Sequence, residues 1–121
     1  MNIKIKTTTL SLTPAISEYV EKRMSAISKF FDNDTTVKCD IELAKTTNHH
    51  NKGDIFKAEV HIVAKDKNIY ASVEKDDLYI AIDLVRDDVV REIKNSNEKH
   101  RSSVRKGGAK IKEIMKNTKS N

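Results

Sequence analysis

Residues 76–105 place apolar side chains at the three- and four-residue spacing of an amphipathic α-helix. The apolar positions share one arc of that helix, namely Leu78, Ile82, Val85, Val89, Ile93 and Val104. Basic side chains gather within roughly 80° on the opposite side, namely Arg91, Lys94, Arg101 and Arg105. The chain must therefore supply a core beneath the apolar side, while the basic side offers positive charge to an anionic partner.

The chain length of 121 residues is that of one domain with a single modest core. No apolar run approaches the roughly 20 residues of a membrane span, and the N-terminus MNIKIKTTT lacks the apolar segment of a secretory signal. A lone cysteine, Cys39, excludes an internal disulfide and fits a reducing compartment. We therefore expect a soluble cytoplasmic domain without membrane association.

The formal net charge of +5 is distributed unevenly along the chain. Residues 1–100 hold 16 Lys and Arg against 17 Asp and Glu, whereas residues 101–121 hold seven against one. Such a basic C-terminal segment is either a solvated terminus or a nucleic-acid contact, and charge alone does not separate the two.

Four segments alternate apolar and polar residues as strands do, namely 2–8, 36–44, 55–64 and 69–73. The clearest is TVKCDIELA, which places Val37, Cys39, Ile41 and Leu43 on one face. On that face Cys39 is better explained as a small buried hydrophobe than as a reactive thiol. Residues 65–68 are typical of a tight turn between the last two strands.

A first helix is expected to begin at Thr13-Pro14, because Thr is a good N-cap and Pro tolerates the first helical position. Its apolar stripe runs through Ile16, Tyr19, Val20, Met24, Ile27, Phe30 and Phe31, until residues 32–34 break the helix. Lys22, Arg23 and Lys29 lie off the stripe, and spacing alone favours a solvated face for them.

The predicted order is therefore β-α-β-β-β-α, an α+β fold. Two helices pack on one face of a four-stranded mixed sheet, and the other face is polar and exposed to solvent. The first two strands should be parallel because a helix connects them. We expect Gly107-Gly108 to stop the long helix. This leaves an α/β domain over residues 1–106 and a flexible basic tail over residues 107–121.

No catalytic or metal-binding motif is found along the chain. The three glycines form no phosphate-binding loop, and Cys39 has no sequence-level His partner. His49-His50 lack a further ligand at a usual spacing, and the carboxylate pairs 76–77 and 87–88 fit a helix start and an exposed helix side. We expect no enzyme activity, cofactor, metal or small-molecule substrate. A basic surface of this kind indicates contact with nucleic-acid phosphates rather than recognition of individual bases.

Two segments resemble those of a known family. LTPAISEYVEKRMSAISKFFD and DDLYIAIDLVRDDVVREI are similar to the two helix segments of the ribosome hibernation promoting factors, also called the ribosome-associated inhibitor or sigma-54 modulation family. The resemblance covers roughly residues 2–106 and implies a fold similar to double-stranded-RNA-binding domains. Only 13 residues follow Gly108, which resembles the short form of the family.

The resemblance also implies a function. Under stress or starvation, members bind the 30S subunit of the 70S ribosome at its A and P sites, where they contact 16S rRNA. They thereby block mRNA and tRNA and preserve the idle ribosome. Some members promote 100S ribosome dimers and others prevent them. The alternatives that stay open are a generic double-stranded-RNA-binding module and a modulator of transcription.

Family members place basic side chains of both helices against rRNA, and Arg23, Lys29, Arg91 and Lys99 stand at matching positions. Lys94, Arg101 and Arg105 extend that surface by geometry, and Lys22 and Lys106 complete the expected rRNA-binding set. Four positions depart from the family pattern, because Asp88, Asn95 and Asn97 stand where relatives often carry lysines and Ala26 stands where some relatives do. We expect the basic tail to compensate for those missing charges.

Overall fold

The computed structural model describes the backbone of residues 1–47 and 53–113, and the side chains of residues 1–46 and 53–96. In chain order its elements are β1 (Asn2–Thr8), α1 (Pro14–Ser25), the 3-10 helix η1 (Ser28–Phe31), β2 (Lys38–Thr47), β3 (Asp54–Ala64), β4 (Lys67–Lys75) and α2 (Leu78–Glu113). This order confirms the predicted β-α-β-β-β-α arrangement. Internal contacts divide the chain into a unit of residues 1–90 and a unit of residues 91–121.

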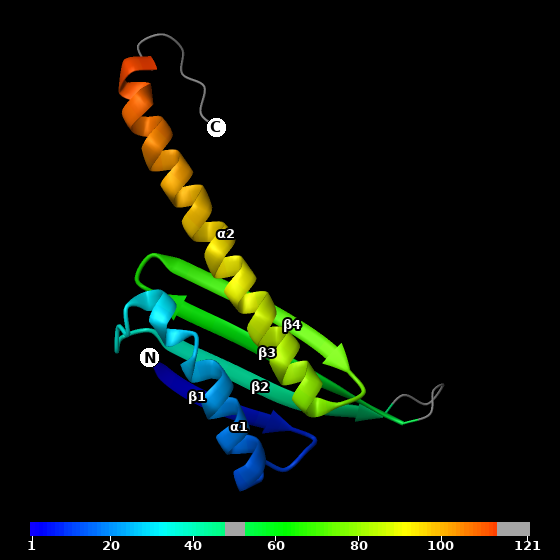
Figure 1. The fold of residues 1–121 in the computed structure, drawn as a ribbon. Helices are drawn as coiled ribbons and strands as arrows, with labels where there is room; N and C mark the ends of the chain where they lie inside the picture. The colour runs from blue at the N-terminus through cyan, green and yellow to red at the C-terminus, as the bar shows by residue number, and fades with distance from the viewer. Residues whose placement is uncertain (48–52, 114–121) are drawn as a thin grey trace. The chain divides into compact units, whose positions relative to one another are not determined.

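The four strands form one sheet in the order β1-β2-β3-β4 (Figure 1). β1 runs parallel to β2, as predicted from the helix that connects them, and the other two pairs are antiparallel. One register row, Ile3, Cys39, Ile62 and Ile69, crosses all four strands. Within residues 1–90, α1 and the first turns of α2 cover the same face of the sheet (Figure 1).

The core lies between that sheet face and the two helices. The sheet and the residue before β2 contribute Val37, Cys39, Ile41, Leu43, Ala58, Val60 and Ile62. The helices of residues 1–90 and the turn after α1 contribute Val20, Met24, Ile27, Ala81, Ile82, Val85 and Val89. All of these side chains are at most 1% exposed. Burying each large aliphatic side chain stabilises the fold by about 1.5–3 kcal/mol. No polar or charged residue is buried within the described ranges. The predicted alternation in the second strand is confirmed.

α1 begins as the sequence predicts, but it ends earlier. Thr13 caps it by accepting the N–H of Ile16 on Oγ1 at 3.2 Å, and Pro14 occupies the first turn. After Ser25 the chain changes to the tighter 3-10 turn of η1, so an unbroken helix to Phe31 is not formed. Ser28 Oγ donates to the carbonyl of Ser25 at 2.7 Å, a local bond that competes with helical pairing.

Both ends of α2 differ from the prediction. The helix begins at Leu78 rather than at residue 76, because the Oδ1 atom of Asp77 accepts the N–H groups of Tyr79 and Ile80 at 2.9 and 3.2 Å. The helix also runs past Gly107-Gly108 to Glu113, so the expected stop at the glycines was wrong. A helical Gly costs only about 1 kcal/mol relative to Ala, and good helix formers flank this pair. The flexible tail stays a prediction.

The strands of the meander are longer than the alternation indicated, since β2 reaches Thr47 and β4 reaches Lys75. Ala64 pairs with Lys67, which shortens the predicted 65–68 turn to two residues. His49-His50 lie outside the described residues. Among the described helices, none is long and apolar enough to cross a membrane.

Candidate nucleic-acid interface

Within residues 1–90, α1 and the first turns of α2 lie side by side on the sheet, and one stripe of these turns meets α1. Tyr79, Asp83, Arg86 and Val90 follow one another at spacings of four, three and four residues, which keeps them on one side of the helix. Tyr79 and Asp83 contact side chains of α1, and Arg86 and Val90 face the end of α1 and η1 across a groove. The seam between the helices therefore carries charged and aromatic groups as well as the aliphatic Val90.

At one end of this seam Tyr19, Arg23, Tyr79 and Asp83 form what we call the inter-helix cluster. The hydroxyl of Tyr19 donates to Oδ1 of Asp83 at 2.7 Å and accepts from Nη2 of Arg23 at 3.1 Å. The ring of Tyr19 meets that of Tyr79 edge-on, with centroids 4.9 Å apart. The cluster thus joins the two helices through both polar and aromatic contacts.

The guanidinium of Arg23 sits between the ring of Tyr19 and the carboxylate of Asp83. Its Cζ lies 4.9 Å from the centroid of the Tyr19 ring, and Nε lies 3.0 Å from Oδ1 of Asp83. This Nε is buried and its N–H is not directed to make a hydrogen bond within the described residues, so the contact is an ion pair. The hydrogen bond to Asp83 raises the pKa of Tyr19, and the hydrogen bond to Tyr19 raises that of Arg23.

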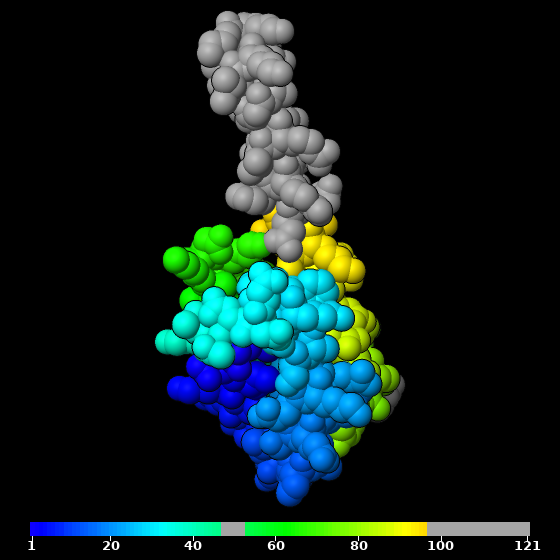
Figure 2. Space-filling view, turned by 60° about the vertical axis from the view of Figure 1, so that its left-hand side comes forward, coloured from blue at the N-terminus to red at the C-terminus, as the bar shows by residue number. Residues whose placement is uncertain are grey.

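At the other end of the seam is a groove of about 230 Å³, lined by Ala26, Lys29, Phe30, Arg86, Asp87 and Val90. Figure 2 shows the surface of α1, in blue to cyan, adjoining that of the first turns of α2. Lys29 Nζ lies 5.6 Å from the centroid of the Phe30 ring, and Arg86 Nη2 lies 2.8 Å from Oδ1 of Asp87. The groove is therefore lined by three apolar residues, one cation from η1 and one ion-paired cation from α2.

The predicted rRNA-binding residues occupy different settings. Lys22 and Lys29 are exposed on α1 and η1, whereas the side chain of Arg23 is only 36% exposed. In the unit of residues 91–121, Arg91 and Lys94 are exposed on α2. The remaining four, Lys99, Arg101, Arg105 and Lys106, fall on the part of α2 whose side chains lie outside the described residues.

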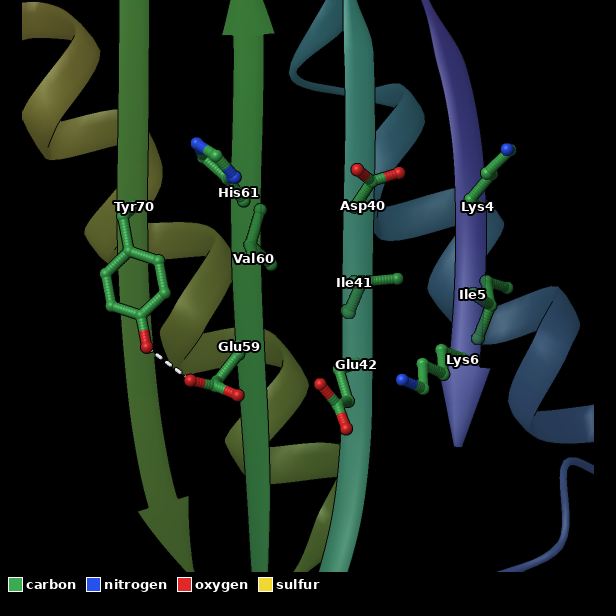
Figure 3. A pocket seen from close by; sticks show the side chains of 10 residues that line it. All are labelled: Lys4, Ile5, Lys6, Asp40, Ile41, Glu42, Glu59, Val60, His61 and Tyr70. Atoms are coloured by element: carbon green, nitrogen blue, oxygen red, sulfur yellow. Dashed lines mark hydrogen bonds between the residues drawn. The ribbon is translucent and has the colours of Figure 1, made fainter. Parts of the chain in front are cut away.

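The sheet face away from the helices has a different charge pattern (Figure 3). It forms a hollow of about 540 Å³ lined by side chains of all four strands, including Lys4 and Lys6 at its edge. Three acids, Asp40, Glu42 and Glu59, occupy the two middle strands, and Glu42 stands directly opposite Glu59 in the register. The prediction of a polar, solvent-exposed face is confirmed. Its acidic centre makes it poorly suited to phosphates.

The described residues hold little that could act as a metal or nucleophile site. They contain no group of three or more His, Cys, Asp and Glu placed to hold a metal ion. Cys39 is fully buried, and burial raises the pKa of its thiol from 9.0 to about 12, so it stays protonated at neutral pH. The interpretation of Cys39 as a small core residue is confirmed.

Residues 3–101 match the sequence model of a family described as "Sigma 54 modulation protein / S30EA ribosomal protein". The chain belongs to this family. A ribosome hibernation promotion factor from Picosynechococcus sp. is 32% identical over 100 residues, covering 83% of this chain and 51% of that protein. One from Bacillus subtilis is 26% identical over 109 residues, covering 90% and 55%. This chain thus spans about half the length of these two relatives.

A solved structure agrees with the fold. The crystal structure of the N-terminal domain of Protein Y from Thermus thermophilus aligns with a TM-score of 0.64 and 26% sequence identity, covering 78% of this chain and 98% of that one. The predicted α+β class and membership of the sigma-54 modulation family are therefore both confirmed.

Two residues of this candidate interface, Arg86 and Asp83, were not predicted from the sequence. Arg86 lies beside the basic arc of the long helix, and its spacing from Tyr79 and Asp83 would have placed it on the seam. Asp83 belongs to the IAID segment that carries the family resemblance, but its pairing with Arg23 depends on how the two helices are rotated against each other. Spacing within one helix gives no signal for such a pair.

Proposed function

We propose that this protein is a ribosome hibernation factor that binds the small ribosomal subunit in its A/P-site region. There it contacts 16S rRNA, excludes mRNA and tRNA, and preserves idle cytoplasmic ribosomes during stress or starvation. The observation that carries the proposal is the family match over residues 3–101, which covers the sheet except its first residue, Asn2, and both helix segments. The names of the two relatives, both ribosome hibernation promotion factors, support it.

The distribution of charge over residues 1–90 supports an RNA contact on the helix side. Lys22 and Lys29 are exposed there, and Arg86 lies across the groove from Lys29. The opposite sheet face has an acidic centre made by Asp40 and Glu59 with their neighbour Glu42. We expect Lys22, Lys29 and Arg86 to attract phosphates and the three acids of the sheet face to repel them, so the domain would bind RNA in one orientation.

A second candidate is modulation of transcription, which the family description also names. It differs in its partner, because a transcription modulator would bind the transcription machinery and leave the occupancy of ribosomes unchanged. A generic double-stranded-RNA-binding module would bind RNA duplexes as tightly as it binds 30S subunits. Binding of the same protein to 30S subunits, to an RNA duplex and to RNA polymerase therefore separates the three.

The direct test of the A/P-site proposal is competition on 30S subunits. Subunits loaded with fluorescent mRNA and tRNA are titrated with the protein, and we expect both ligands to be released as the protein binds. A Lys22→Glu/Lys29→Glu variant should release neither at the same concentration. Simultaneous retention of mRNA, tRNA and protein on one subunit would contradict the proposed site, although it would leave ribosome binding intact.

A further inference from the structure

The carboxylate of Asp83 contacts two groups of α1 with a single oxygen. Its Oδ1 accepts the Tyr19 hydroxyl at 2.7 Å and lies 3.0 Å from Nε of Arg23. The Tyr19 hydroxyl in turn accepts from Nη2 of the same guanidinium at 3.1 Å. These three contacts close a ring that fixes the plane of the Arg23 guanidinium between α1 and α2.

The ring of contacts involves the Nε side of the Arg23 guanidinium and does not involve its Nη1 side. Arginine carries five N–H donors in a rigid planar fork. Nε and Nη2 turn inward to Asp83 and Tyr19, and none of the contacts made by Arg23 among the described residues involves Nη1. The side chain remains 36% exposed. An edge formed by Nη1 and Nη2 is the one that binds a phosphate with two parallel hydrogen bonds.

We propose that Asp83, acting with Tyr19, is a positioning residue that holds Arg23 so that its outer edge meets an RNA phosphate. The inference rests on the proposed function and extends it to a residue that is itself negative. An arginine held in place loses less side-chain freedom on binding than a mobile one. Asp83 therefore aids binding to a polyanion through Arg23, against the direction of its own charge.

The proposal is testable because losing the negative charge of Asp83 and losing its positioning role would change the affinity for 30S subunits in opposite directions. Asp83→Asn keeps an oxygen acceptor but removes one negative charge. If Asp83 acted only through the field around the site, this variant would bind 30S subunits more tightly than the wild type. If Asp83 positions Arg23, we expect Kd at low salt to rise by about three- to tenfold, because the variant loses the ion pair that holds the guanidinium in place.

Three further variants show whether the effect passes through Arg23. Arg23→Ala should weaken binding at least as much as Asp83→Asn does, and the double variant should bind no more weakly than Arg23→Ala alone. Tyr19→Phe keeps the ring beneath the guanidinium but removes the hydroxyl, so an intermediate loss of affinity is expected. Asp40→Asn, the same change on the open sheet face, is the matched control and should bind as the wild type does.

Kd for 30S subunits is measured by fluorescence at several salt concentrations, and urea unfolding confirms that each variant is folded. Wild-type affinity or tighter binding for both Asp83→Asn and Tyr19→Phe would overturn the positioning role and leave the proposed function in place. An additive double variant would overturn it as well. Wild-type protein that does not bind 30S subunits would overturn the proposed function and the positioning role together.

Discussion

The hydroxyl of Tyr19 on α1 donates a 2.7 Å hydrogen bond to Oδ1 of Asp83 on α2, across 64 positions of sequence. Both residues belong to the two segments that resemble the hibernation factors, SEYVEKR and AIDLVR. Polar residues of the two segments therefore join the helices directly. Two polar residues of the family signature, which look like surface positions in the sequence, thus form a contact between the two helices in the fold.

The start of α2 depends on the side chain of Asp77. Asp77→Ala removes the acceptor for two backbone N–H groups, and we expect the free energy of unfolding to fall by about 1 kcal/mol. Asp76→Ala removes the neighbouring exposed carboxylate and should stay within about 0.5 kcal/mol of the wild type. Urea titration followed by circular dichroism at neutral pH measures both. Equal losses would show that local charge, rather than the cap, stabilises the helix start.

Ile82 and Ile80 provide a matched pair on α2, because they are the same residue in opposite settings. Ile82 is fully buried, whereas Ile80 is 47% exposed. Ile82→Ala should lower the free energy of unfolding by about 2–5 kcal/mol, because it removes buried apolar surface and leaves a residual cavity. Ile80→Ala should change it by less than about 0.5 kcal/mol. A reversed order would mean that the apolar stripe of α2 faces away from the sheet.

The thiol of Cys39 should be inert in the folded protein. Burial raises its pKa to about 12, so alkylation at pH 8 should proceed only as fast as the protein opens, and urea should accelerate it strongly. Mass spectrometry after timed labelling gives both rates. Rapid alkylation of protein that is folded by circular dichroism would contradict the buried placement.

The same thiol adds a pH dependence of defined sign. The folded pKa lies above the ordinary value of 9.0, so the neutral form is favoured in the folded state. The stabilisation is complete below about pH 9 and is lost as the pH rises toward 12, because the unfolded chain ionises first. Cys39→Ala should therefore lose less stability than the wild type between pH 8 and 10.5. Parallel stability profiles for the two proteins would contradict this assignment.

Much of the fold was predictable because single elements carry their own periodicity. The alternation around Cys39 fixed which face of β2 is inward, and Thr13-Pro14 placed the start of α1. The end of α2 was not predictable in this way. The cost of Gly107-Gly108 is small beside the helical preference of their neighbours, so a glycine pair did not act as a stop.

The candidate interface was predictable only as a set of cations. Sequence position indicated that Arg23 and Lys29 share the helix layer, but it gave no information on which acids would pair with which bases. The contact between Arg23 and Asp83 and the groove between Lys29 and Arg86 arise from the packing of α1 against α2. Such contacts depend on helix rotation and crossing, which the spacing within each helix does not specify.

The basic tail, residues 107–121, should contribute to ribosome binding mainly through its charge. Residues 107–121 hold four lysines and one glutamate. Their deletion should weaken binding and reduce the salt slope by about 0.7–0.9 log units for each phosphate that the tail neutralises. Replacing the four lysines by glutamine in the full chain is the control and should reproduce both effects. Unchanged affinity and slope in both variants would show that the tail does not contact RNA.

The most direct measurement of the central claim is co-sedimentation with 70S ribosomes through a sucrose gradient at low salt. Wild-type protein and a Lys4→Glu/Lys6→Glu variant, altered on the open sheet face, should migrate with the ribosomes. A Lys22→Glu/Lys29→Glu variant has the same net charge as that control and should remain near the top of the gradient. The 100S peak in the same gradient shows whether ribosome dimers form. Absence of the wild-type protein from every ribosomal fraction would contradict the account.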